Sequence, residues 1–213
     1  MTRPSALLVG FLFLAGSLPS QTGPGIGGHS PGELWSAIGR GLPCTTSDST
    51  GLFMTRRAPV KVCDADHGVA LAFLRDTLYL VTVSVADDTI GWDQDYSPSN
   101  DTVSVESWWH ARGRASGTDW FGEPDSVTVR GESYGRNTGW NRWLTAYWHS
   151  AAPPKWGAWL IVHKEQFSVG SFLSAQAMVC GSVVSGVSCE LRNSLPLPDS
   201  ISAKVQRTHR RRP

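Results

Sequence analysis

The chain has 213 residues, with 19 Lys or Arg, 18 Asp or Glu and a formal net charge of +1. Five basic residues lie in the last ten positions, so the body between an expected leader and this tail carries about −5. A negative body disfavours nucleic acid as a partner, and the length suits one domain with a sizeable core.

The N-terminus has the layout of a cleaved secretory signal. Arg3 precedes an unbroken apolar run from Ala6 to Ala15, and small and helix-breaking residues follow it. This order is typical of a signal peptide, which we place at residues 1–20, with cleavage between Ser17 and Thr22. A membrane span needs about 20 apolar residues, so this run is too short to be one. The leader therefore predicts export into an oxidising compartment.

Residues 21–43 are dense in glycine and proline. They predict an irregular N-terminal arm with at best one short helical turn, around Glu33 to Ile38. We expect such an arm to fold only against a partner.

The chain holds four cysteines, an even number that favours two disulfides in a secreted protein. They are Cys44, Cys63, Cys180 and Cys189. Three pairings are possible, and joining the early pair and the late pair needs the shortest loops. A zinc site is disfavoured, because no Cys-x-x-Cys is present and no histidine follows at finger spacing.

The longest apolar stretch after the leader predicts a β-hairpin. Val69 to Leu74 and Thr77 to Val85 are rich in β-branched, leucine and aromatic residues, and Arg75-Asp76 has the length of a tight turn. Both faces of the second strand begin apolar, so we expect burial on both sides.

The segment after the hairpin predicts a loop with a glycan. Residues from Asp87 to Pro98 are acidic and rich in turn formers, and they lead to Asn100, the start of the one N-glycosylation sequon in the chain. We expect Asn100 to be glycosylated.

Tryptophan is concentrated in the second half of the chain, and its spacing predicts an amphipathic helix that ends before Pro153. Its apolar positions recur at i, i+3, i+4, i+7 and i+8. They are Trp140, Trp143, Leu144, Tyr147 and Trp148. A strand from Ala158 to His163 and a second apolar run near Phe167 to Leu173 should follow.

These elements predict an α+β fold: a small disulfide-linked secreted domain with a β-hairpin, an amphipathic helix and long irregular segments. We assign residues 44–195 to this domain and residues 196–213 to a basic disordered tail.

Catalytic motifs are missing from the sequence. It contains no Gly-x-Ser-x-Gly elbow, His-Glu-x-x-His or phosphate-binding loop. Scattered bases and acids remain, and none shows the spacing of a metal site or a catalytic triad. These are His110, His149, His163, Asp119, Glu123 and Glu165. We therefore expect no enzyme activity, no cofactor and no metal.

Two classes of secreted protein fit these features. One is a free-standing β-rich binding module, either immunoglobulin-like or carbohydrate-binding. The immunoglobulin version is disfavoured, because the first tryptophan after Cys63 is Trp92 and no tyrosine lies two residues before Cys180. The other class is a subunit without its own anchor that completes a membrane-bound partner.

The region around the hairpin resembles a known family. Cys44 stands in LPC, the approach GLFMTRRAPVKV leads to Cys63, and the spacer DADHG precedes the strands VALAFL and TLYLV. A late close cysteine pair, Cys180 and Cys189, and a basic tail follow. This layout resembles envelope glycoprotein L of the alphaherpesviruses, the subunit that pairs with glycoprotein H.

The resemblance implies a non-catalytic role in infection. Members of the family bind glycoprotein H, assist its folding and transport, and with it help the fusion glycoprotein to join viral and host membranes. The subunit would lie peripherally on the virion envelope, the host cell surface and the Golgi. The resemblance also implies the pairs Cys44–Cys63 and Cys180–Cys189. The arm and the hairpin would face the partner.

We predict that Cys63→Ser reduces secretion or partner assembly more than Asn100→Gln does. Loss of a native disulfide in a secreted domain typically costs about 2 to 5 kcal/mol. Immunoblots of the medium and pull-downs compare the two variants. An unchanged yield of complex after Cys63→Ser would count against a structural bridge at this position.

Overall fold

The computed structural model describes residues 24–49, 53–90, 104–133, 139–150, 152–153, 155–167 and 170–189. The expected signal peptide, the Asn100 sequon and the basic tail lie outside these residues. Within the described part, no helix is both long and apolar enough to cross a membrane.

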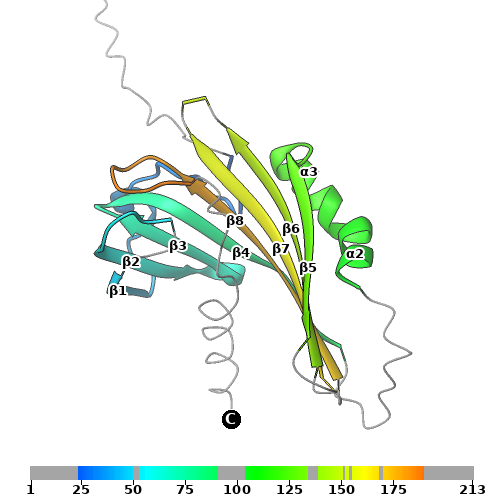
Figure 1. Cartoon of the computed structure of the whole chain (residues 1–213). Coiled ribbons are helices and arrows are strands. Elements are labelled where there is room, and N and C mark those ends of the chain that lie inside the picture. The colour runs from blue at the N-terminus through cyan, green and yellow to red at the C-terminus, as the bar shows by residue number, and fades with distance from the viewer. Residues whose placement is uncertain are drawn as a thin grey trace, which may run out of the picture.

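The strands form one eight-stranded antiparallel sheet in the order β1-β2-β3-β4-β8-β7-β6-β5 (Figure 1). The strands of the first half are β1 (Cys44–Ser49), β2 (Ala58–Ala65), β3 (Val69–Leu74) and β4 (Thr77–Ile90). Those of the second half are β5 (Ser126–Ser133), β6 (Gly139–Ser150), β7 (Trp156–Phe167) and β8 (Gly170–Gly181). Each half is a meander, and the two meanders meet where β4 pairs with β8.

Each meander follows a helical segment. The first half has α1 (Trp35–Ile38), within the helical turn predicted for the arm. The second has α2 (Val105–Trp108), a π-helical turn (Trp109–Gly113) and α3 (Arg114–Phe121). The domain is therefore small, disulfide-linked and mostly β, and the predicted α+β balance overstated its helical content.

The predicted hairpin is confirmed, with strands β3 and β4 joined at Arg75-Asp76. Both turn residues have positive φ, 49° for Arg75 and 62° for Asp76. This is the backbone of a type I′ turn, whose twist matches that of two antiparallel strands. Burial on both faces is also confirmed: Val81 is 0% exposed in the core cluster of one face and Tyr79 is 1% exposed in the cluster of the other, with a register shift between them.

The predicted aromatic helix is wrong, because this segment is strand β6. In a strand, residues four apart share a face and residues three apart do not. Leu144 and Trp148 lie in the core cluster on one face, whereas Tyr147 packs against the cluster on the other. A strand buried on both faces carries large apolar residues at odd and at even positions. In β6 these positions happen to match the spacing of an amphipathic helix.

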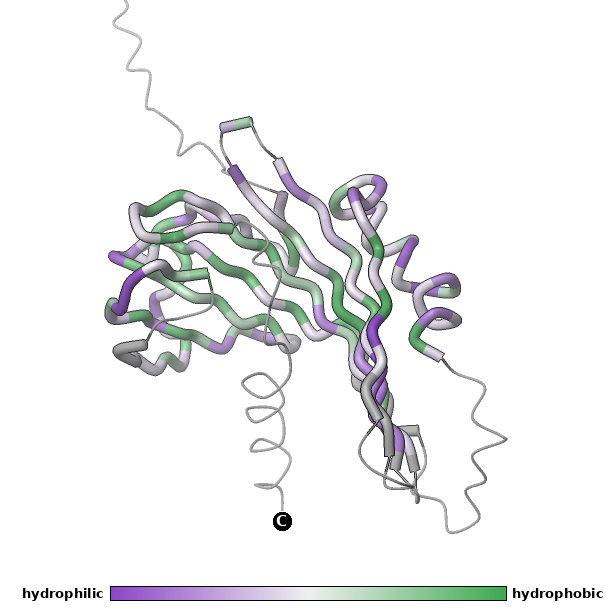
Figure 2. The backbone as a smooth tube through the Cα atoms, in the orientation of Figure 1, coloured by the Kyte–Doolittle hydropathy of each residue, from purple (hydrophilic) through white to green (hydrophobic). Residues whose placement is uncertain are grey.

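One face of the sheet is covered by helices and by the arm. A row of side chains on this face belongs to a single core cluster and crosses five pairs of neighbouring strands. The row is Cys63, Leu71, Val81, Val179, Ala158 and Trp148. Figure 1 shows α2 and α3 beside the second half of the sheet, and hydrophobic residues recur along the strands in Figure 2.

The arm folds against its own sheet, which corrects the expectation that it needs a partner. The amide of Trp35 donates to the carbonyl of Asp76 at 2.8 Å, and Leu78 donates to Glu33 at the same distance. The Trp35 ring meets Phe73 edge-on, with centroids 5.2 Å apart. The hairpin thus supplies both the hydrogen bonds and the apolar surface that order the arm.

Loops cover part of the opposite face. Phe53 stacks on Trp159 with ring centroids 4.6 Å apart, and Met54 forms an isolated bridge with Val187. Disulfide Cys180–Cys189 closes the segment that contains Val187. The early and late loops therefore fold over one end of this face together.

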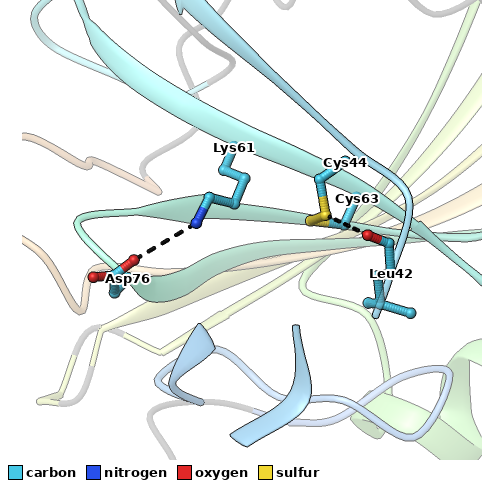
Figure 3. The surroundings of a disulfide bond; sticks show 5 residues. All are labelled: Leu42, Cys44, Lys61, Cys63 and Asp76. Atoms are coloured by element: carbon cyan, nitrogen blue, oxygen red, sulfur yellow. Dashed lines mark hydrogen bonds and ion pairs between the residues drawn. A yellow bond between two sulfur atoms is a disulfide. The ribbon is translucent and has the colours of Figure 1, made fainter. Parts of the chain in front are cut away.

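The structure contains two disulfides, as predicted: Cys44–Cys63 and Cys180–Cys189. The first joins two residues that are directly paired between β1 and β2 (Figure 3). Lys61 lies nearby, with its ammonium 3.8 Å from Asp76 and 3.8 Å from the centroid of the Trp35 ring. The arm, β1 and the hairpin turn are thereby held close to one another.

We predict that Gly117→Ala destabilises the domain, although alanine favours helices over glycine by about 1 kcal/mol. A Cβ at Gly117 would lie 2.7 Å from Cη2 of the fully buried Trp148, whose indole N–H donates to the Gly122 carbonyl at 2.8 Å. Overpacking of this kind costs about 1 to 3 kcal/mol. Urea unfolding measures the effect.

Ser116→Ala on the same helix is the matched control, and it should change the free energy of unfolding by a few tenths of a kcal/mol, roughly. Equal stability of Gly117→Ala and Ser116→Ala would contradict the close packing of α3 on β6.

Candidate interaction surfaces

Strand β5 exposes apolar side chains at an edge of the sheet. It is the last strand in the order and pairs only with β6 among the described strands. Val127 is 42% and Val129 is 43% exposed, and the only other exposed large hydrophobic residue among those described is Leu34. We call the outer side of β5, with these two valines, the β5 edge.

The helices leave the two valines of this strand exposed. Val127 and Val129 lie opposite Ala146 and Leu144 of β6, which belong to the helix-covered core. Helix α2 packs on β6 and β7. The two valines therefore continue an apolar face beyond its helical cover, next to backbone groups that a further strand could use.

The opposite edge of the sheet has a different chemistry. Strand β1 has the sequence CTTSDS and is fixed to β2 by the disulfide at Cys44. A short polar edge strand is a common protection against unwanted pairing. The apolar character is thus specific to the β5 edge.

A second surface lies on the loop-covered face, beyond the loops. Trp143 and His163 are directly opposite on β6 and β7, and their rings stack with centroids 5.1 Å apart and an angle of 6°. The His163 Nε2 lies 3.1 Å from the Oδ1 of Asn141, which is buried beneath the partly exposed rings. Asn141 is opposite Glu165 in the same pair of strands. We call these four residues the Trp143 row.

Burial controls the charges of the Trp143 row. It lowers the pKa of His163 from 6.5 to about 4, so the ring is neutral at physiological pH. Burial also raises the pKa of Glu165. The row therefore combines an aromatic pair, whose histidine is neutral, with the amide of Asn141 and the carboxyl of Glu165.

The other candidate bases and acids are dispersed over the molecule. His149 pairs with Asp125 at 2.8 Å and is half-exposed, and Glu123 pairs with Arg114 of α3 at 3.3 Å. His110 and Asp119 are exposed on the helical segment. Within the described ranges, no cluster of three His, Cys, Asp or Glu residues could hold a metal ion.

The hairpin lies at the centre of the sheet, which corrects its expected place at a partner surface. Strands β3 and β4 are paired on both sides, by β2 and by β8. Leu71 and Val81 are fully buried. The β5 edge was not predicted from the sequence. The short alternation in Val127-Thr128-Val129 is compatible with a strand, but which strand lies at the edge of a sheet depends on long-range pairing.

We predict that acid unfolding depends on His163. The unfolded chain binds a proton on this histidine below about pH 6.5, whereas the folded protein does so only near pH 4, so the free energy of unfolding falls as pH drops through this window. With allowance for solvent screening, the loss is about 2 kcal/mol. Denaturant titrations of wild type and His163→Gln between these pH values measure it, and the variant should show a flatter profile.

Glu165→Gln is the control, because the raised pKa of Glu165 stabilises the folded state as pH falls and its removal cannot flatten the profile. Identical slopes for wild type and His163→Gln would show that another group controls acid unfolding.

Comparison with known proteins adds no relative to these observations. No protein-family model, no curated protein and no solved structure matches the chain.

Proposed function

We propose that this chain is a non-catalytic secreted subunit that acts by binding another protein through the β5 edge. The observation that carries the proposal is the exposure of Val127 and Val129 beside the outer backbone of an edge strand. An extended segment of a partner could add to this edge, with main-chain hydrogen bonds giving affinity and alternate side chains giving specificity.

Glycoprotein H is the partner that we propose, on the strength of the resemblance to glycoprotein L. The disulfides Cys44–Cys63 and Cys180–Cys189 have the pairing that this resemblance implies. In this proposal the chain assists folding and transport of glycoprotein H, and the heterodimer helps to trigger membrane fusion. The partner would hold the subunit at the virion envelope and the host cell surface.

The alternative is a free-standing secreted module that binds carbohydrate through the Trp143 row. The rings of Trp143 and His163 and the carboxyl of Glu165 are partly exposed, and such groups suit the apolar faces and hydroxyl groups of a sugar. An immunoglobulin-like module needs two packed sheets, whereas the described strands form one.

The first test is co-expression of the tagged mature chain with a glycoprotein H ectodomain from an alphaherpesvirus. A one-to-one complex should be co-secreted, and each chain alone should be secreted poorly. The double variant Val127→Lys and Val129→Lys should weaken the complex at least about tenfold, which corresponds to about 1.4 kcal/mol. Pull-down and light scattering measure these outcomes.

Thr46→Lys on the opposite edge is the matched control and should leave the complex intact, because Thr46 is an exposed residue of β1. Efficient secretion of the chain alone, with no binding to glycoprotein H, would reject the subunit and favour the carbohydrate-binding module. Binding that ignores the two lysines would place the interface away from the β5 edge.

A further inference from the structure

The two exposed valines of the β5 edge are placed symmetrically on either side of Thr128. Val127 and Val129 flank it, both point to the helix-covered face, and both are exposed. Thr128 points to the opposite face with Arg130. The three residues Val127-Thr128-Val129 read the same in both directions, so their side chains suit a two-fold antiparallel pair.

We propose that β5 pairs with β5 of a second copy of this chain, in an antiparallel register centred on Thr128. The occupant is thus another molecule of the same protein, related by a two-fold axis through the edge. This goes beyond the proposed function, because it requires no other protein and stands whether or not glycoprotein H binds.

The register follows from the side-chain pattern. With Thr128 opposite Thr128 of the copy, each Val127 lies opposite a Val129, so two valine pairs form on the helix-covered face. A two-fold pair centred on Val127 or on Val129 sets only one valine opposite a valine. Directly opposite apolar side chains are about 4.5 to 5.5 Å apart at Cβ and stabilise a sheet.

Charge and backbone chemistry also fit this register. Arg130, the charged residue nearest to Thr128 on β5, lies opposite Ser126 of the copy, so no like charges meet there. Pro124 comes just before the strand and has no N–H to donate, so the ladder ends near it. The pairing is therefore confined to the part of β5 that contains the valines.

Engineered cysteines test both the association and its register in the full mature chain. Opposite residues of an antiparallel pair have Cα atoms about 4.5 to 5.5 Å apart, within the range that a disulfide bridges. Thr128→Cys should therefore form a covalent dimer under mild oxidation, read on a non-reducing gel. Thr128 is exposed, so the new thiol is accessible to oxidant and to a second copy.

Arg130→Cys and Ser126→Cys are the matched controls, at exposed positions on the same strand and face. Each lies four residues out of register with itself, about 13 Å along the strand, too far to bridge. Neither should cross-link alone, but an equimolar mixture of the two should, because position 126 lies opposite position 130.

Analytical ultracentrifugation supplies a readout without cysteines. The wild-type chain should show a reversible monomer–dimer equilibrium, and Val127→Lys with Val129→Lys should shift the dissociation constant at least tenfold, roughly, toward monomer. A wild-type chain that stays monomeric at all concentrations would overturn the proposal. Cross-linking of Arg130→Cys alone as fast as Thr128→Cys would overturn the register.

These outcomes are separable from those of the proposed function. Cross-linking through Thr128→Cys without binding to glycoprotein H would support the homodimer and reject the role as a glycoprotein H subunit. A monomer that still forms the complex with glycoprotein H would do the reverse.

Discussion

The pairing of β4 with β8 is the interaction on which the rest of the structure depends. It joins two four-stranded meanders, neither of which has more than a short helical segment of its own. Across this seam Val81 lies opposite Val179, and both are fully buried. Because the core clusters on both faces draw residues from both halves, the apolar surface of each meander is covered only when the seam is formed.

The central seam determines which strands lie at the edges of the sheet. Since the backbone groups of β4 and β8 hydrogen-bond to each other, the unpaired backbone groups of the described sheet lie at β1 and β5. The first edge is short, polar and joined to its neighbour by a disulfide. The second is longer and carries two exposed valines, so it offers more backbone and more apolar surface for strand pairing.

Local chemistry in the sequence predicted the local elements. The β3–β4 hairpin, its turn at Arg75-Asp76, the helical turn of the arm and two disulfides follow from patterns of a few residues. Strand β6 was mistaken for a helix because burial on both faces removes the polar alternation that marks a strand. The β5 edge could not be predicted, because no local sequence pattern indicates which strand lies at the edge of the sheet.

The two proposed occupants of the β5 edge need the same backbone groups, so they compete. A second copy is limited by its own symmetry, because the proline before each β5 ends the ladder on both sides of the axis. A pair of short strands buries much less than the roughly 1,600 Å² of a standard interface, so self-association should be weak and reversible. A foreign strand has no such symmetry and can continue toward Ser133. The homodimer would thus cover the valines and protect the chain against aggregation. A partner that covers more of the strand would displace the second copy.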